Sequence, residues 1–225
     1  MSNELTVWLF REDGPIETLT FLLLLVASGF MLYVYWRLRG QPDKGGAKWG
    51  YLLLGLLFLV GAMEEISWGQ RIFNYQIEFV QNASSQDETN FHNLKMFQNL
   101  SQYSPWLKVI GHPDRIFTIF MFFLTTLIPI MNAVSKPVRN VLSRIQIPVT
   151  TWAVSLSCVL SWILPEMMDL ASNSKWLHHL TQELQEGMFA LTLLFFSLYE
   201  YRRHAVGAMS DASESIEITA DVSGL

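Results

Sequence analysis

Two adjacent carboxylates, Glu64 and Glu65, follow a strongly apolar run at residues 49–63. A run of this length and composition is typical of the body of a membrane-spanning helix. Insertion scales that are lenient toward charge still assign about 2.5–3.5 kcal/mol to an acid at the centre of such a helix. Because two acids at this depth are costly, we interpret the pair as a candidate catalytic site, in which either carboxylate could act as a general base.

Arg71 extends this motif toward the end of the same predicted helix. In a continuous helix Glu64, Ser67 and Arg71 share one face, and Glu65 is turned about 100° away. Arg71 could then bind an anionic head group or stabilise the negative charge that develops in a reaction. The alternative is an ion pair at a helix end, with Trp68 as an anchor at the membrane interface.

A second candidate site comes from His179, Glu183 and Glu186, which are spaced i, i+4 and i+7. On an α-helix these side chains fall on one face. One imidazole and two carboxylates can bind a divalent metal such as zinc, iron or manganese, with His92 as a fourth ligand. Their order differs from the Glu-x-x-His spacing of di-iron bundles. The alternative is a polar helix start, where the helix dipole favours acids.

The composition of the chain predicts its fold class. Of 225 residues, 51% are hydrophobic, the net charge is −5 and Cys158 is the single cysteine. The weak negative charge gives no indication of nucleic acid as a partner, and one cysteine excludes an intramolecular disulfide. Five long apolar runs predict an all-α, polytopic transmembrane bundle over residues 1–205. The predicted spans are residues 16–36, 49–68, 115–134, 147–168 and 180–201.

The distribution of Lys and Arg predicts the orientation of the bundle. Basic residues follow the first, third and fifth spans, and an odd number of spans places these regions on one side. By the positive-inside rule this side is cytoplasmic, so the N-terminus is outside and the C-terminus inside. The outer connection at 74–114 mixes aromatic and polar residues, which predicts interfacial helices. Residues 206–225 are rich in Ser, Asp and Glu, which predicts a disordered acidic tail.

This topology brings most of the acidic residues to the outer ends of the helices, together with His92, His112, His178 and His179. Crowded carboxylates cannot all ionise cheaply without a countercharge, which a metal ion, shared protons or Arg71 could supply. We therefore expect an outward-facing pocket that contains acids and histidines.

Three functions fit such a pocket, and membrane lipids are the expected partners in each. The first is a metal-dependent, hydrolase-type enzyme that acts on a lipid or lipid-linked substrate, with Glu64 or Glu65 activating a metal-bound water. The second is a cation- or proton-coupled transporter, which the nearly apolar inner halves of the spans disfavour. The third is a non-catalytic subunit or assembly factor of a membrane complex.

Three segments carry a resemblance to known sequences: Glu-Asp-Gly-Pro-Ile-Glu at 12–17, Glu-Glu-Ile-Ser-Trp-Gly-Gln-Arg at 64–71 and Glu-Thr-Asn-Phe-His-Asn-Leu at 88–94. Together they resemble an uncharacterised family of bacterial multi-pass inner-membrane proteins. The resemblance covers the first half of the chain and part of the last predicted span. It implies a location in the bacterial inner membrane, with the site on the periplasmic side, and it implies no particular activity.

Overall fold

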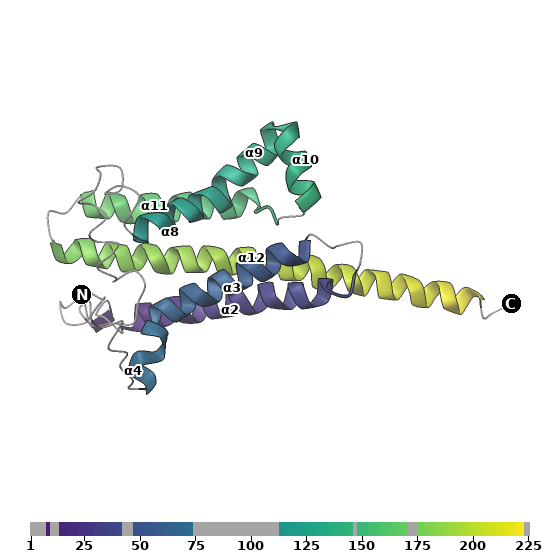
Figure 1. Ribbon diagram of the computed structural model, residues 1–225, viewed down its shortest axis with the longest axis horizontal. Helices are drawn as coiled ribbons and strands as arrows, with labels where there is room; N and C mark the ends of the chain where they lie inside the picture. Colours follow the sequence, from purple (N-terminus) through teal and green to yellow (C-terminus); the bar gives the residue numbers. More distant parts are fainter. Residues whose placement is uncertain are drawn as a thin grey trace.

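The computed structural model describes residues 8–9, 14–41, 47–73, 113–145, 148–170 and 175–222, and these residues are helical apart from short turns (Figure 1). The predicted interfacial helices at 74–114 fall almost entirely outside the described residues. The helices are α2 (Pro15–Leu38), α3 (Ala47–Glu65), α4 (Gln70–Phe73), α8 (Pro113–Phe122), α9 (Ile128–Val134), α10 (Lys136–Ile145), α11 (Trp152–Leu170) and α12 (Lys175–Val222), with a short 3-10 turn η2 (Ser67–Gly69) and a π-helical turn η4 (Phe123–Leu127).

Three segments are long and apolar enough to cross a membrane: Pro15–Leu38, Phe117–Val134 and Trp152–Leu170. They correspond to the first, third and fourth predicted spans, and they indicate an integral membrane protein. Helices α3 and α12 coincide with the second and fifth predicted spans, and both carry several charged residues: Lys48, Glu64 and Glu65 in α3, and Glu183, Glu186 and Glu200 in α12. The all-helical fold class is therefore confirmed.

Side-chain burial follows the pattern of a membrane bundle. Large apolar side chains are exposed on every long helix, for example Leu22, Leu53 and Phe123. Small hydroxyl side chains are buried between the helices, for example Ser28 and Thr192. Lipid tails are as apolar as leucine, so apolar side chains gain nothing by leaving them, whereas hydroxyls gain partners by facing a neighbouring helix.

Helix α12 lies at the centre of the arrangement, packed against α2 on one side and against α11 on the other (Figure 1). Helices α2 and α3 form a closely packed antiparallel pair, and the segment from α8 to α9 packs on α11. We call the end where α2 finishes and α3 begins the inner end, and the opposite end the outer end. Helix α10 lies at the inner end and runs across the bundle axis (Figure 1).

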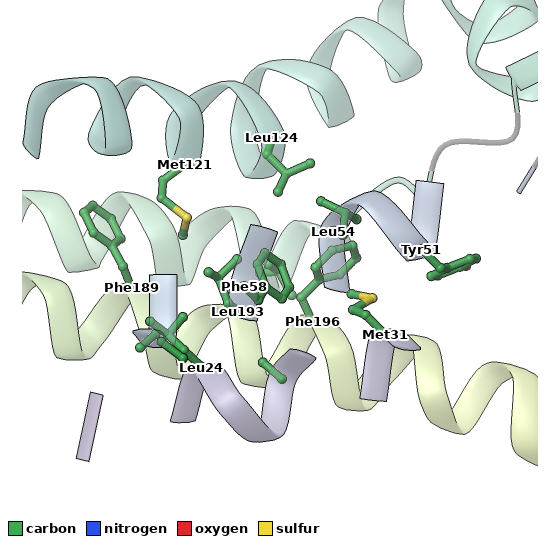
Figure 2. Packing of buried hydrophobic residues seen from close by; sticks show 14 of the residues in the cluster. Leu24, Met31, Tyr51, Leu54, Phe58, Met121, Leu124, Phe189, Leu193 and Phe196 are labelled. Carbon is green, nitrogen blue, oxygen red and sulfur yellow. The ribbon is translucent and has the colours of Figure 1, made fainter. Parts of the chain in front are cut away.

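The core between these helices is built from large apolar side chains. Met31 of α2, Phe58 of α3 and Phe189 and Phe196 of α12 are almost completely buried, and Met121 of α8 joins the same cluster (Figure 2). These side chains form an apolar layer between the two ends of the bundle. Polar groups at the inner and outer ends are therefore separated by packed hydrocarbon.

Helices α2 and α3 approach closely at Gly55. Ser28 of α2 donates a 2.7 Å hydrogen bond to the backbone oxygen of Gly55. A Cβ atom at Gly55 would lie 2.7 Å from Cδ2 of Leu32, so the position requires the absence of a side chain. Small residues at helix contacts permit this kind of close approach between membrane helices.

Pro129 accounts for the π-helical turn η4. Proline has no N–H group, so the carbonyl of Thr125, four residues earlier, loses its helical donor. Thr150 Oγ1 donates a 3.0 Å hydrogen bond to this carbonyl oxygen, and Ser155 Oγ donates to it as well. Hydroxyls of neighbouring segments commonly replace the donor that a proline removes from a membrane helix. The helix before Pro129 therefore contains a widened turn, which these hydrogen bonds connect to the start of α11.

Two predicted boundaries are wrong. The second span was expected to continue to residue 68, but α3 ends at Glu65. The fourth was expected from residue 147, but α11 begins at Trp152, because Pro148 and the residues after it are not helical. The tail at 206–225 was expected to be disordered, but α12 continues through most of it, to Val222. Alanine, methionine and glutamate in this segment have high helix propensity.

Candidate functional site

The backbone turns sharply immediately after the Glu64–Glu65 pair. Ser67, Trp68 and Gly69 have φ angles of 48°, 56° and 79°, in the left-handed region that favours glycine. For residues with a side chain this conformation costs of order 1–3 kcal/mol each. The expected stripe of Glu64, Ser67 and Arg71 on one continuous helix is therefore wrong, because the turn separates α3 from α4.

The turn gives Glu64 a partner that the sequence analysis did not assign to it. Trp68 Nε1 donates a hydrogen bond to Glu64 Oε1. Trp68 was expected to act only as an interface anchor, yet the left-handed turn directs its indole back onto α3. Arg71 lies in α4, where its side chain is outside the described part of the structure. A role for Arg71 therefore stays a prediction.

Carboxylates of three helices lie near enough to Glu65 to act on it electrostatically. Glu65 is affected first by its own burial and then, among charged groups, by Glu183 of α12, Glu17 of α2 and Glu64 beside it. All of these side chains are partly buried. These carboxylates repel one another when they are ionised, and the repulsion is less screened at partly buried positions than it would be in open solvent. A bound cation or a proton would weaken this repulsion.

Close packing of α12 on α2 explains why Glu17 and Glu183 lie at the same level. A Cβ atom at Gly187 would be 3.4 Å from Thr20 Oγ1 and 4.0 Å from Ile16 Cγ2. Glu183 lies one turn before Gly187, and Glu17 follows Ile16 directly. The sequence analysis did not include Glu17 in the site. Its position in the first turn of a span, at the outer end, was the available signal.

The predicted metal ligands are only partly described. Glu183 and Glu186 lie on α12 and are partly buried. The side chain of His179, at the start of the same helix, and the whole of His92 lie outside the described residues. Within the part of the chain that the structure describes, no three or more His, Cys, Asp or Glu side chains are arranged to hold a metal ion. The described acids alone thus do not form a metal centre.

A second polar group lies at the inner end, where the sequence analysis expected nothing functional. Glu200 of α12 is completely buried, and its Oε2 accepts a 2.5 Å hydrogen bond from the hydroxyl of Tyr51 in α3. The same hydroxyl oxygen is 2.9 Å from Nε2 of His204. Arg203 Nη1 lies 3.8 Å from the other oxygen, Glu200 Oε1. We call Tyr51, Glu200, Arg203 and His204 the inner cluster.

The signal for the inner cluster was an acid inside an apolar helix. Glu200 follows a long apolar run in α12, much as Glu64 and Glu65 do in α3, but it was not among the predicted site residues. Its main partner, Tyr51, is 149 residues away in the sequence. No local spacing connects two residues at that separation, so only the folded arrangement reveals the contact.

Comparison with protein-family models, with curated proteins and with solved structures finds no match to this chain.

Proposed function

We propose that the chain is a five-span integral membrane protein with its N-terminus outside and its C-terminus inside. The antiparallel order of α2, α3, the segment from α8 to α9, α11 and α12 supports this topology (Figure 1). Basic residues gather at the inner end, as the positive-inside rule requires of a cytoplasmic face. They include Arg37, Arg39, Lys48, Lys136, Arg139, Arg144, Arg202 and Arg203.

Aromatic residues at the inner end support the placement of a membrane surface there. Trp36, Trp49 and Trp152 come from three helices, and more than half of each side chain is exposed. The charged group of Arg39 lies 5.6 Å from the ring centre of Trp36, and that of Lys48 lies 5.9 Å from Trp49. Exposed tryptophans with basic neighbours are typical of a membrane interface. The resemblance to bacterial inner-membrane proteins adds the proposal that this membrane is the bacterial inner membrane.

Single cysteines would test the orientation in a Cys158→Ala background. We expect Gly40→Cys to react with a membrane-impermeant maleimide only after the cells are permeabilised. We expect Gln86→Cys, in the predicted outer connection, to react in intact cells. Labelling of both cysteines from the same side would contradict the five-span topology, because that topology places residues 40 and 86 on opposite sides of the membrane.

For the outer end we propose a cation-dependent site that carries out hydrolase-type chemistry on a lipid or lipid-linked substrate. One observation carries this proposal: carboxylates of α2, α3 and α12 lie near enough to Glu65 to act on it electrostatically. A divalent cation there would balance the repulsion and could activate a water molecule. Glu183 and Glu186 would bind the cation with His92 and His179, and Glu64 or Glu65 would accept the proton from water.

Metal content would test this proposal on purified, folded protein. We expect a stoichiometric divalent metal, zinc or one of iron and manganese, in the unaltered chain and its loss from Glu183→Ala. Glu166→Gln is the matched control, because Glu166 is exposed near the end of α11. A folded protein that retains no metal after exposure to these ions would remove the metal-dependent mechanism.

The inner cluster favours a second candidate function, a proton- or cation-coupled transporter. A carrier needs ionisable groups that can be reached from both sides of the membrane. Glu65 is the last residue of α3, whereas Glu200 contacts Tyr51 near the start of α3, so the two acids lie toward opposite ends of the bundle. The apolar layer around Phe58 and Phe196 separates them in this conformation. Proton flux into liposomes would test it: transport predicts loss of flux in both Glu65→Gln and Glu200→Gln, whereas an enzyme of the outer face predicts no flux.

A further inference from the structure

Among the residues that the structure describes, Glu200 is the charged side chain that is completely removed from solvent. An ionised carboxylate in such a place is stable only if both of its oxygens have partners. Oε2 has the hydroxyl of Tyr51. Oε1 accepts no hydrogen bond, and its nearest positive charge, Arg203, lies 3.8 Å away on an exposed side chain. The carboxyl group is therefore only half satisfied as an anion.

When Glu200 is ionised, the hydrogen bonds of the inner cluster have a defined direction. Tyr51 has one hydroxyl hydrogen, and it is donated to Glu200 Oε2. The 2.9 Å contact between Tyr51 Oη and His204 Nε2 must then use a hydrogen on the imidazole. The imidazole, the phenol and the carboxyl group form a chain of three titratable groups that are linked by two short contacts.

This series of three hydrogen-bonded groups leads from the surface into the bundle. The side chain of His204 is 18% exposed and that of Glu200 is 0% exposed, with Tyr51 between them. The described charged or titratable groups that act on the phenol and carboxyl are Arg203, His204 and Tyr199, all on α12. At its inner end α2 buries only apolar side chains, Met31, Val34 and Leu38.

We infer that Glu200 is a proton-binding site inside the bundle, and that it exchanges its proton with the solution at the inner end through Tyr51 and His204. The inference is independent of the proposed outer site, because it concerns the opposite end of the bundle and other residues. The ligand is the proton itself. Two short contacts, a buried carboxyl with one oxygen that accepts no hydrogen bond and a partly exposed imidazole carry the inference.

The transfer is balanced in protons and charge. A protonated His204 passes the hydrogen on Nε2 to Tyr51 Oη while Tyr51 passes its hydroxyl hydrogen to Glu200 Oε2. His204 becomes neutral, Tyr51 is unchanged, and Glu200 becomes a neutral acid. In the product Glu200 donates to Tyr51 Oη, and Tyr51 donates to His204 Nε2. Each of the two hydrogen bonds has reversed its direction, so the next transfer requires the chain to return to its first state.

Infrared difference spectroscopy of the full chain in liposomes would test the inference. The band to follow is the C=O stretch of a protonated carboxyl group, assigned by labelling glutamate with ¹³C. After a pH jump on the side that carries the C-terminal tail, we expect this band to change reversibly. We expect Glu200→Gln to lack it, and the matched control Glu166→Gln to keep it. If Glu200→Gln does not fold, the labelled unaltered chain and the two variants below still decide the question.

Tyr51→Phe and His204→Gln test the route to the carboxyl group. Removing a positioned proton-transfer group typically slows transfer by about a hundredfold or more. We expect Tyr51→Phe to keep the buried carboxyl band while its response to the pH jump slows by about that factor, and we expect His204→Gln to slow it as well. An unchanged rate in both variants, a response only to pH on the opposite side, or the absence of a protonated carboxyl band at every pH would overturn the inference.

Discussion

Thr150 Oγ1 donates a 3.0 Å hydrogen bond to the carbonyl oxygen of Thr125. This carbonyl is the one that Pro129 deprives of its helical donor, and Ser155 Oγ donates to it as well. The proline, the π-helical turn and the start of α11 thus form one structural unit. The effects of substitutions in this unit on the free energy of unfolding should not be additive, since a buried carbonyl that loses both hydroxyl donors is left without a partner.

We expect the combined change Thr150→Val with Ser155→Ala to lower the free energy of unfolding by about 1–2 kcal/mol, because it leaves the Thr125 carbonyl unsatisfied. In a Pro129→Ala background the restored N–H can donate a hydrogen bond to that carbonyl. The same pair of changes should then lower the free energy of unfolding by less. Denaturation of the purified protein in mixed micelles gives both values. Equal costs in the two backgrounds would contradict the link to Pro129. Ser143→Ala is the control, because Ser143 is exposed and bonds within α10.

Gly55→Ala should lower the free energy of unfolding by about 1–3 kcal/mol, as expected for overpacking. The new Cβ would lie 2.7 Å from Leu32 Cδ2 and 3.3 Å from the Leu32 backbone nitrogen, so the Leu32 side chain must move or α2 and α3 must separate. Gly29→Ala is the matched control. A Cβ atom there meets nothing within 4 Å, and alanine in a helix gains up to about 1 kcal/mol over glycine. Thermal denaturation in detergent would compare the two, and equal effects would contradict close packing at Gly55.

Gly69→Ala should destabilise the turn after α3. The residue has a φ of 79°, and a Cβ atom would approach Phe73 Cδ2 at 3.0 Å. We expect a loss of about 1–3 kcal/mol, the usual range for a residue with a side chain in a sparsely populated backbone region. Gly40→Ala, where a Cβ atom would have open space, should change little. If Gly69→Ala is as stable as the unaltered chain, the left-handed turn is not required by the fold.

Glu65→Gln should raise the free energy of unfolding by about 1 kcal/mol at neutral pH in metal-free buffer. The change removes one of several like charges that act on each other at partly buried positions. Acidic buffer should reduce the difference, because protonation removes the same repulsion in the unaltered chain. The exposed Glu166→Gln is again the comparison. A clear loss of stability in Glu65→Gln would show that a favourable positive partner already holds this carboxylate.

The sequence predicted the helices well because each long apolar run is itself the physical reason for a membrane helix. It predicted the ends less well, since the ends depend on local chemistry that hydropathy does not detect. Helix α3 stops at Glu65 because the next residues adopt a left-handed turn, although Ser67 and Trp68 show no preference for it. Pro148 indicates that α11 begins after it, but the apolar residues on both sides of Pro148 make the predicted span look continuous.

The candidate site was predictable only where one helix supplied its residues. The spacing of Glu183 and Glu186 follows from helix geometry, and so does the adjacency of Glu64 and Glu65. The proximity of Glu17 to Glu65 depends instead on how α2 packs against α12, which is set by Gly187 and Thr20. The contact between Tyr51 and Glu200 depends likewise on helix packing, so the inner cluster emerged only from the folded arrangement.

The continuity of α12 has a mechanical consequence for the two acidic regions. Glu183 near the outer end and Glu200 at the inner end belong to one unbroken helix, separated by 17 residues or about 25 Å of rise. A rigid helix transmits translation and rotation along its whole length. We therefore expect a ligand that draws Glu183 toward α3 to displace Glu200 relative to Tyr51 as well, which would link occupancy at one end of the bundle to the hydrogen bonds at the other.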